Sequence, residues 1–131
     1  EEAGVVAIDV AGAGGTNWVK IDQMRSGADV GDLLESGIPT AFALRDIVQA
    51  VKIPVIASGG IRTGMDVAKS IAMGASLAGM ALPFLKPATR GWEGVMRVMR
   101  DVTVSLKKEM AACGVGNIEQ LKSVRIKDMD S

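Results

Sequence analysis

The sequence predicts an α/β protein of about three β/α units that form part of a (β/α)8 barrel. Three short apolar stretches typical of buried strands are each followed by a stretch with apolar residues at helical spacing. Strands that alternate with helices form a parallel sheet with right-handed crossovers. A small open doubly wound sheet would have the same element order, but the similar lengths of the units and the 48% hydrophobic content favour the barrel. Because a complete barrel needs about 250 residues, we expect residues 1–131 to form a single partial domain, about half of one.

The first unit starts with a strand at residues 5–10 (VVAIDV), and its helix is predicted at residues 40–51, directly after Pro39. Between them, residues 12–39 form a long connection that is polar and rich in glycine. Loops of this length are uncommon in compact domains unless they are functional or disordered. In a β/α protein this loop lies at the carboxyl end of its strand, where sites are built. We therefore expect it to contribute to a site.

The second unit has a strand at residues 53–57 and a helix at residues 65–73 that ends at Gly74. The strand is almost wholly apolar and β-branched, as expected when both faces of a strand are covered. Thr63 and Asp66 have the spacing of a capping box, which predicts where the helix starts.

The third unit has a strand at residues 76–81 and a long helix at residues 92–113, followed by a short helix at residues 117–124 with Asn117 as its cap. One apolar stripe runs along the long helix, formed by Val95, Met99, Val102, Leu106 and Met110. We expect the methionines to fill the core rather than to bind a ligand, namely Met65, Met73, Met96, Met99 and Met110. The single cysteine, Cys113, is also predicted to pack.

The composition argues against several classes of function. The net charge is zero, with 15 basic and 15 acidic residues, and no basic tract with aromatic residues supports nucleic-acid binding. No apolar stretch approaches the roughly 18–20 residues of a membrane span, and neither end resembles a secretory signal. A single cysteine excludes an internal disulfide and fits a cytoplasmic location. Because the chain has no histidine, it lacks Ser-His and Cys-His catalysis and the commonest metal ligand.

The stretch SGGIRTGMD, residues 58–66, joins the second strand to its helix and is the first candidate site. Gly59 and Gly60 allow the backbone to approach a ligand and to direct N–H groups toward it. The start of the following helix attracts anions, and Arg62 adds a positive charge. The alternative is an ordinary turn, with Arg62 in solvent or in a salt bridge.

The third strand ends near Ala81 and Leu82, just before Pro83. In (β/α)8 proteins a phosphate often lies between the loops that follow the last two strands. If these are those two strands, backbone amides of both loops converge on one anion, and we predict a phosphate site between them. The alternative is that Pro83 simply ends the strand.

The stretch GAGGTNW, residues 12–18, is a second candidate for ligand binding. Its glycines leave room for a flat or bulky ligand, and Thr16 and Asn17 supply a hydroxyl and an amide. It lacks the Gly-Lys-Ser/Thr end of a Walker motif, and a flexible loop is the alternative. Among the acid–base candidates Asp9 is the most interesting because it lies in an apolar strand, although a structural, hydrogen-bonded role is the alternative. The others are Asp22, Asp29, Asp32 and Glu35.

Several stretches together resemble type 2 isopentenyl-diphosphate isomerase, in the same order and spacing over essentially the whole chain. They are AIDVAGAGGTNW, GIPTAFAL, PVIASGGIRTGMDVAKSIAMGA, LAGMALPFLKPA and SLKKEMAACGVGNIEQLK. The Gly-Gly-Thr and Ser-Gly-Gly-Ile-Arg parts are shared more loosely with other FMN-dependent (β/α)8 proteins. The resemblance implies that the chain is the C-terminal half of a (β/α)8 TIM barrel and holds strands six to eight.

The resemblance also implies an activity and its cofactors. The family interconverts isopentenyl and dimethylallyl diphosphate in isoprenoid biosynthesis by adding and removing a proton, with FMN reduced by NADPH and with Mg²⁺ on the substrate diphosphate. Thr16 lies where the family hydrogen-bonds FMN, and Gly59 shapes the turn that holds the FMN phosphate. The implied phosphate-binding residues are Gly60, Ile61, Arg62, Ala81 and Leu82. Ala11 stands where the family usually has a serine that contacts FMN.

The family's other FMN contacts, its substrate-binding histidine and glutamine, and its metal-binding glutamate lie N-terminal to this segment. No catalytic or metal-binding residue is therefore assigned here. The chain also begins at Glu1 rather than at methionine, and we expect a fragment that is inactive alone. Its open sheet edges predict self-association or a homo-oligomer.

Two alternatives stay open. One is part of another FMN-dependent (β/α)8 oxidoreductase, such as a hydroxy-acid oxidase, although the histidine base expected near its flavin does not occur in this chain. The other is a non-catalytic half-barrel that binds phosphate.

Overall fold

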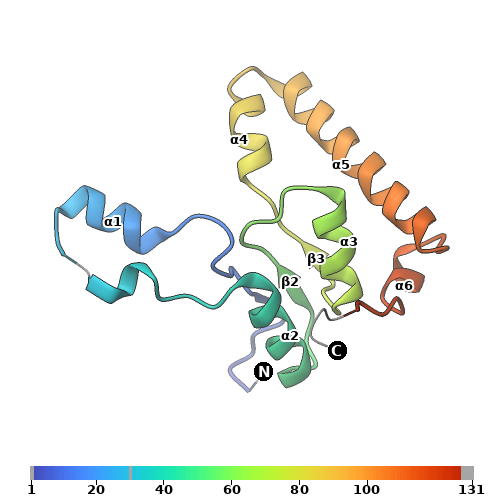
Figure 1. The fold of residues 1–131 in the computed structure, drawn as a ribbon, viewed down its shortest axis with the longest axis horizontal. Coiled ribbons are helices and arrows are strands. Elements are labelled where there is room, and N and C mark those ends of the chain that lie inside the picture. Colours follow the sequence, from blue (N-terminus) through green and yellow to red (C-terminus); the bar gives the residue numbers. More distant parts are fainter. Residues whose placement is uncertain (1, 30, 128–131) are drawn as a thin grey trace.

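A computed structural model describes residues 2–29 and 31–127 and contains a three-stranded parallel sheet (Figure 1). The strands are β1 (Ile8–Asp9), β2 (Val55–Ala57) and β3 (Leu77–Ala78), and they lie side by side in chain order. Ile56 of the central strand pairs with Asp9 on one side and with Leu77 on the other. The parallel order with helices between the strands confirms the predicted α/β class and its three units.

All three strands are shorter than predicted, although the chain stays paired beyond their ends. The amide of Gly12, three residues after β1, still donates to the carbonyl of Ser58 at 3.0 Å. β1 and β3 are edge strands with a partner on one side only, so regular pairing stops where that neighbour turns away. Val6, which was predicted to belong to the first strand, is 80% exposed.

Helices α2 (Thr40–Ala50) and α3 (Gly64–Ala72) pack on one face of the sheet, and the main core lies between them and β2. That core consists of Leu44, Val55, Ala57 and Ala75. Side chains alternate along a strand, so Ile56 and its partners Asp9 and Leu77 lie on the other face. Leu77 is 61% exposed there. A doubly wound sheet has helices on both faces, whereas a barrel has helices outside and strand side chains inside, so the arrangement is that of a barrel segment.

A second core lies where α5 (Trp92–Ala112) and α6 (Ile118–Leu121) pack on α3. Its buried residues are Ala68, Ile71 and Leu121. Leu106 and Met110 of α5 pack against them. A side chain on Gly64 would overlap the backbone of Leu106, so the glycine at the start of α3 allows α5 to approach closely.

The long helices begin and end within one residue of their predicted bounds. Both predicted caps are confirmed: Thr63 accepts a hydrogen bond from the amide of Asp66 at 3.2 Å, and Asn117 accepts one from the amide of Gln120 at 2.9 Å. The helix after Asn117 is shorter than predicted. It ends at Leu121, which is a buried residue of the second core.

Four side chains that were predicted to pack are exposed instead, namely Met65, Met96, Met99 and Cys113. The packed stripe of α5 passes through Val98 and Val102, which are half-buried, rather than through Met99. Cys113 is the C-cap residue of α5 and lies beyond the turn that packs on α3. The predicted helical spacing of apolar residues on α5 was correct. These residues, however, extend around more of the helix than the side that packs on α3.

Three further helical segments occur where the sequence analysis predicted none. The connection over residues 12–39 contains α1 (Trp18–Ser26) and a 3₁₀ turn, η1 (Gly31–Leu34), and α4 (Leu82–Ala88) follows β3. The signals were present, since Asn17 caps α1, Gly27 ends it with a φ of 69°, and Pro83 lies in the first turn of α4. The apolar residues of α1 do not gather on one face of the helix, so it has no apolar stripe from which periodicity could detect it.

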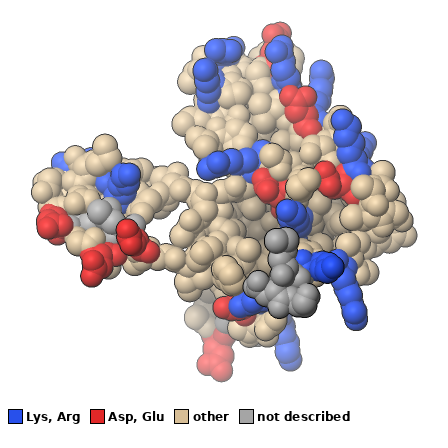
Figure 2. All heavy atoms as spheres, in the orientation of Figure 1, with Lys and Arg blue, Asp and Glu red and all other residues tan. Residues whose placement is uncertain are grey.

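The helix α1 and the turn η1 form an arm that stands apart from the sheet (Figure 1). The arm and its return segment expose large apolar side chains, namely Trp18, Ile21, Met24, Leu33 and Ile38. Figure 2 shows many Lys and Arg side chains with some Asp and Glu among them along α4 and α5, and mixed charges at the end of the arm. Burial within this chain therefore does not account for its hydrophobic content. Within the described ranges, none of the helices has the length and apolarity needed to cross a membrane.

Candidate functional site

The loops that follow β1 and β2 lie against each other at the carboxyl ends of their strands. A Cβ on Gly14 would lie 2.6 Å from the carbonyl oxygen of Gly59, and one on Gly15 would lie 2.9 Å from the amide nitrogen of Gly60. The Thr40 hydroxyl, at the start of α2, donates to the Gly59 carbonyl and joins a third segment to the pair. The clustered glycines thus permit close packing of one loop on the other, a purpose the sequence alone did not reveal.

The turn after β2 presents backbone amides that have no partner in the described chain. Gly59 and Gly60 have φ values of 95° and 86°, which L-residues rarely adopt. The amides of Gly60 and Ile61 donate to no group among the residues that the structure describes, and Ile61 is only 8% exposed. Polar groups in such a position usually have a partner. The turn is therefore suited to an acceptor that this chain does not supply.

The next residues are held by the start of α3. The Asp66 carboxylate accepts hydrogen bonds from the amides of Arg62 at 3.0 Å and Thr63 at 2.9 Å, and also from the Thr63 hydroxyl. Burial by itself raises the pKa of Asp66, but these hydrogen bonds and the charge of Lys69 outweigh it and bring the pKa below its ordinary value of 3.8. The capping box thereby fixes the backbone from which the Arg62 side chain extends.

Arg62 itself is exposed, and its side chain forms no ion pair with any residue in the described part of the chain. The alternative to an anion site was an ordinary turn, with Arg62 in solvent or in a salt bridge. Among the described residues, that salt bridge is not found. The guanidinium is available to an anion at this edge of the sheet.

The loop after β3 begins beside the loop after β2. The amide of Gly79 donates to the carbonyl of Ala57 at 2.8 Å, so the segments that follow β2 and β3 leave the sheet side by side. α4 then starts at Leu82, and the amides of Ala81 and Leu82 donate to no group in residues 2–29 and 31–127. The loop after β3 therefore presents a second pair of amides without a described partner, at the end of the strand that neighbours β2.

Thr16 reaches the same edge by way of the glycine loop. It follows Gly15, which packs on Gly60, and it is exposed with no hydrogen bond from its hydroxyl to a described residue. Asn17, in contrast, accepts a hydrogen bond from the Lys20 amide as the cap of α1. Of the two polar residues in the GAGGTNW stretch, Asn17 has this structural role.

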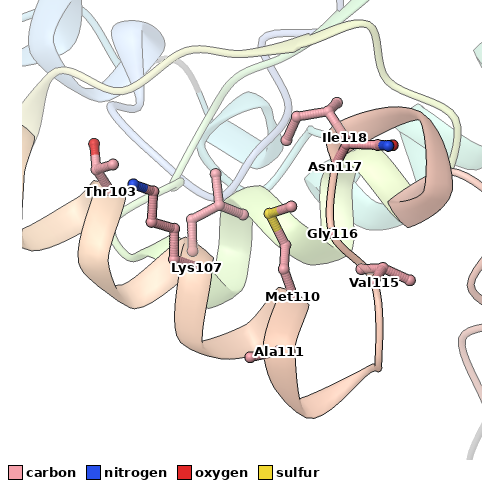
Figure 3. Close-up of a pocket in the computed structure, with 9 residues that line it drawn as sticks. Thr103, Lys107, Met110, Ala111, Val115, Gly116, Asn117 and Ile118 are labelled. Atoms are coloured by element: carbon pink, nitrogen blue, oxygen red, sulfur yellow. The ribbon is translucent and has the colours of Figure 1, made fainter.

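One hollow in the described surface touches the candidate loops. A cleft of about 280 Å³ between α2 and α3 is bounded by Gly14, by residues 59–61 and by Lys69. Thr16, Arg62, Ala81 and Leu82 do not line it. Another hollow, of about 460 Å³, lies between α5 and the turn into α6, where Met110 and Ile118 face it (Figure 3). No predicted site residue lies in that second hollow.

The carboxylates predicted for acid–base work do not gather into one site. Asp9 is exposed, and its Oδ1 accepts hydrogen bonds from the Ser58 hydroxyl and from the amide of Ala11 at 3.1 Å. The others, on or beside the arm, are Asp22, Asp29, Asp32 and Glu35. Within the described residues, no group of three or more Cys, Asp or Glu side chains is placed to hold a metal ion.

Comparisons with known proteins identify the family of the chain. The pattern that defines the FMN-dependent dehydrogenases matches residues 1–128. The chain belongs to the FMN-dependent dehydrogenase family. One solved structure similar to this chain is that of a protein described as a lactate oxidase from Pediococcus acidilactici. Its TM-score with this chain is 0.75, and the two sequences are 28% identical. That match covers 97% of this chain and 33% of the oxidase.

Several curated relatives of the chain are isopentenyl-diphosphate delta-isomerases, which confirms the resemblance to that family. The chain is 42% identical to the one from Pyrococcus furiosus, over 96% of its own length and 34% of the relative. It is 47% identical to the one from Halobacterium salinarum, over 93% of its own length and 36% of the relative. The chain thus spans about a third of the length of the curated relatives it matches.

The residues present fit the phosphate group of FMN, the cofactor that names the family. A phosphate needs several hydrogen-bond donors and positive charge. The paired strand ends supply the amides of Gly60, Ile61, Ala81 and Leu82, all without a partner among the described residues. The guanidinium of Arg62 is close along the chain and is also not engaged in an ion pair there.

Proposed function

We propose that this chain is the part of an FMN-dependent isopentenyl-diphosphate isomerase that holds the phosphate end of the flavin. The complete enzyme would interconvert isopentenyl and dimethylallyl diphosphate. The observation that carries this proposal is the 42–47% identity to isomerases from several archaea over almost the whole chain. The unpartnered amides at two neighbouring strand ends support it, since they are the donors that a phosphate requires.

Each proposed site residue has a distinct task. The amides of Gly60 and Ile61, together with those of Ala81 and Leu82, would bind the FMN phosphate, and Gly59 allows the turn. Arg62 would balance the phosphate charge. Thr16, on the opposite loop, would donate its hydroxyl to the flavin. When bound, reduced FMN supplies the group implicated in adding a proton to the substrate and removing one.

Other steps of the proposed reaction would depend on residues that this chain does not contain. NADPH would reduce the flavin, and Mg²⁺ would bind the substrate diphosphate through residues that this chain does not contain. The open face of the sheet, with Leu77 exposed, would close against the other strands of the barrel. The chain alone would then be inactive, and the complete protein would be a cytoplasmic enzyme that forms a homo-oligomer.

A second candidate is oxidation of a 2-hydroxy acid. It is favoured by the family's description and by the 28% identity to the protein described as a lactate oxidase. The higher identity to the isomerases argues against it. So does the absence of histidine from this chain, since such oxidation needs a base near the flavin.

One experiment separates the two candidates. The full-length gene product is loaded with FMN, reduced anaerobically with dithionite and incubated with Mg²⁺ and isopentenyl diphosphate in D₂O. Deuterium in the recovered diphosphates, read by NMR, is the expected result. In parallel, the oxidised protein is mixed with lactate. Bleaching of the flavin by lactate without deuterium exchange would establish the oxidase instead.

A further inference from the structure

The carboxylate of Asp9 connects the two loops that form the candidate site. Asp9 is the last residue of β1. Its Oδ1 accepts a hydrogen bond from the hydroxyl of Ser58, which directly follows β2, and another from the amide of Ala11 at 3.1 Å. Ser58 immediately precedes Gly59, and Ala11 immediately precedes Gly12. One side chain therefore holds the first residue of each glycine loop.

Ala11 needs such a hold because its backbone is unusual. Its φ is 43°, and it is the one non-glycine residue with positive φ in the described part of the chain. Alanine in this left-handed conformation is disfavoured by its Cβ. Such a conformation persists only where surrounding interactions determine it. The hydrogen bond from the Ala11 amide to Asp9, two residues earlier, is an interaction of that kind.

The position of the pair on the sheet explains why it can act on both loops. Asp9 is the cross-strand partner of Ile56, and Ser58 is two residues further along, so Asp9 and Ser58 point to the same face. The Gly12 amide donates to the Ser58 carbonyl at 3.0 Å. Two hydrogen bonds therefore set the spacing of the two loops: one from the Ser58 hydroxyl to Asp9, and one from the Gly12 amide to the Ser58 carbonyl.

We propose that Asp9 is a positioning residue for the phosphate end of FMN. It holds Ser58, which directly precedes the turn whose amides would bind the phosphate, and it holds Ala11 in the loop that packs against that turn. This inference rests on the proposed function. It assigns a task to a carboxylate that otherwise has no evident reason to lie in an apolar strand.

A comparison of FMN with riboflavin isolates this role, because the two ligands differ only in the phosphate. Both are titrated by flavin fluorescence into the full-length apoprotein, as wild type and as the variants Asp9→Ala, Asp9→Asn and Ser58→Ala. Asp101→Ala, on the exposed surface of α5, is the matched control. A merely structural role of Asp9 would weaken both ligands equally.

We expect Asp9→Ala to raise the Kd for FMN about three- to tenfold, the loss of one or two hydrogen bonds, and to leave the Kd for riboflavin within about twofold. Asn can accept the same two hydrogen bonds, so Asp9→Asn should stay near wild type. Ser58→Ala should show a smaller FMN-selective loss, and Ala11→Gly should recover part of the Asp9→Ala loss by relieving the left-handed residue.

Three results would overturn the assignment: an equal loss for both flavins, no loss for either, or a loss in Asp101→Ala of the same size. If Asp9→Ala does not fold, the selective loss in Ser58→Ala decides the question. A wild-type protein that binds FMN no better than riboflavin would remove the proposed phosphate site itself. That failure is distinguishable, because it occurs before any variant is compared.

Discussion

Gly60 lies so close to the carbonyl oxygen of Gly14 that a side chain on Gly60 would overlap it. Two segments separated by 46 positions in the chain thus meet backbone to backbone at the candidate site. The contact makes glycine necessary for a reason beyond its φ of 86°. It also means that a Gly60→Asp variant would combine a clash with a charge, and would not test the anion site cleanly.

Gly60→Ala should therefore destabilise the full-length protein more than Gly27→Ala does. Both positions have positive φ, which costs alanine about 1–2 kcal/mol, but a Cβ on Gly27 meets no atom within 4 Å. The overlap at Gly60 should add about 1–3 kcal/mol. Urea unfolding of the flavin-free protein measures both losses, and equal losses would show that the loop contact has no energetic weight.

Arg62→Gln should weaken FMN binding about five- to thirtyfold, because it removes a charge-assisted hydrogen bond to the phosphate. The loss should shrink at high salt, where the charge is screened. Arg97→Gln, on the exposed surface of α5, is the control and should leave the titration unchanged. An Arg62→Gln protein with wild-type affinity at low salt would remove Arg62 from the phosphate site.

Thr63→Ala should lower the free energy of unfolding by about 1 kcal/mol, since the Thr63 hydroxyl is half of the capping box at the start of α3. The control is Thr103→Ala, because the Thr103 hydroxyl donates to the carbonyl of Met99 at an exposed position of α5. That change should have a smaller effect. A difference between the two variants below the error of the urea titration would contradict the assigned cap.

Acidification should remove the contribution of Asp66. Its pKa in the folded protein is below the ordinary value of 3.8, so its ionised form stabilises the fold at neutral pH. That stabilisation is full well above 3.8 and is lost as the pH falls through the folded value. Urea unfolding of wild type and Asp66→Asn between pH 7 and pH 3 should show a difference that narrows with acid. A constant difference would assign the effect to something other than ionisation.

Leu77→Ser should destabilise the full-length protein by about 2–4 kcal/mol, a value typical of core positions. Leu77 is 61% exposed in this chain, but it faces the side of the sheet that a barrel would enclose. Leu85→Ser, at a side chain that is 66% exposed on α4, should cost far less. Similar small losses at both positions would mean that the sheet face stays open in the complete protein.

Local signals predicted the helices well and the strands less well. The capping box at Thr63, the cap at Asn117 and the stripe along α5 depend on neighbours within one or two turns, and the sequence contains all of them. α1 escaped detection because its apolar residues are spread around the helix rather than along one face. The strands were overestimated because their ends depend on partners elsewhere in the chain rather than on their own residues.

The order of the three β/α units, the starts of α2, α3 and α5 and the two glycine-rich stretches follow from the amino-acid sequence alone, because periodicity, capping and glycine content are local properties. Two contacts could be known only from the folded chain: Gly14 and Gly15 lie against Gly59 and Gly60, and Asp9 accepts a hydrogen bond from Ser58. Those contacts join residues more than 40 positions apart, and they exist only once parallel pairing has brought the carboxyl ends of the strands to one edge of the sheet.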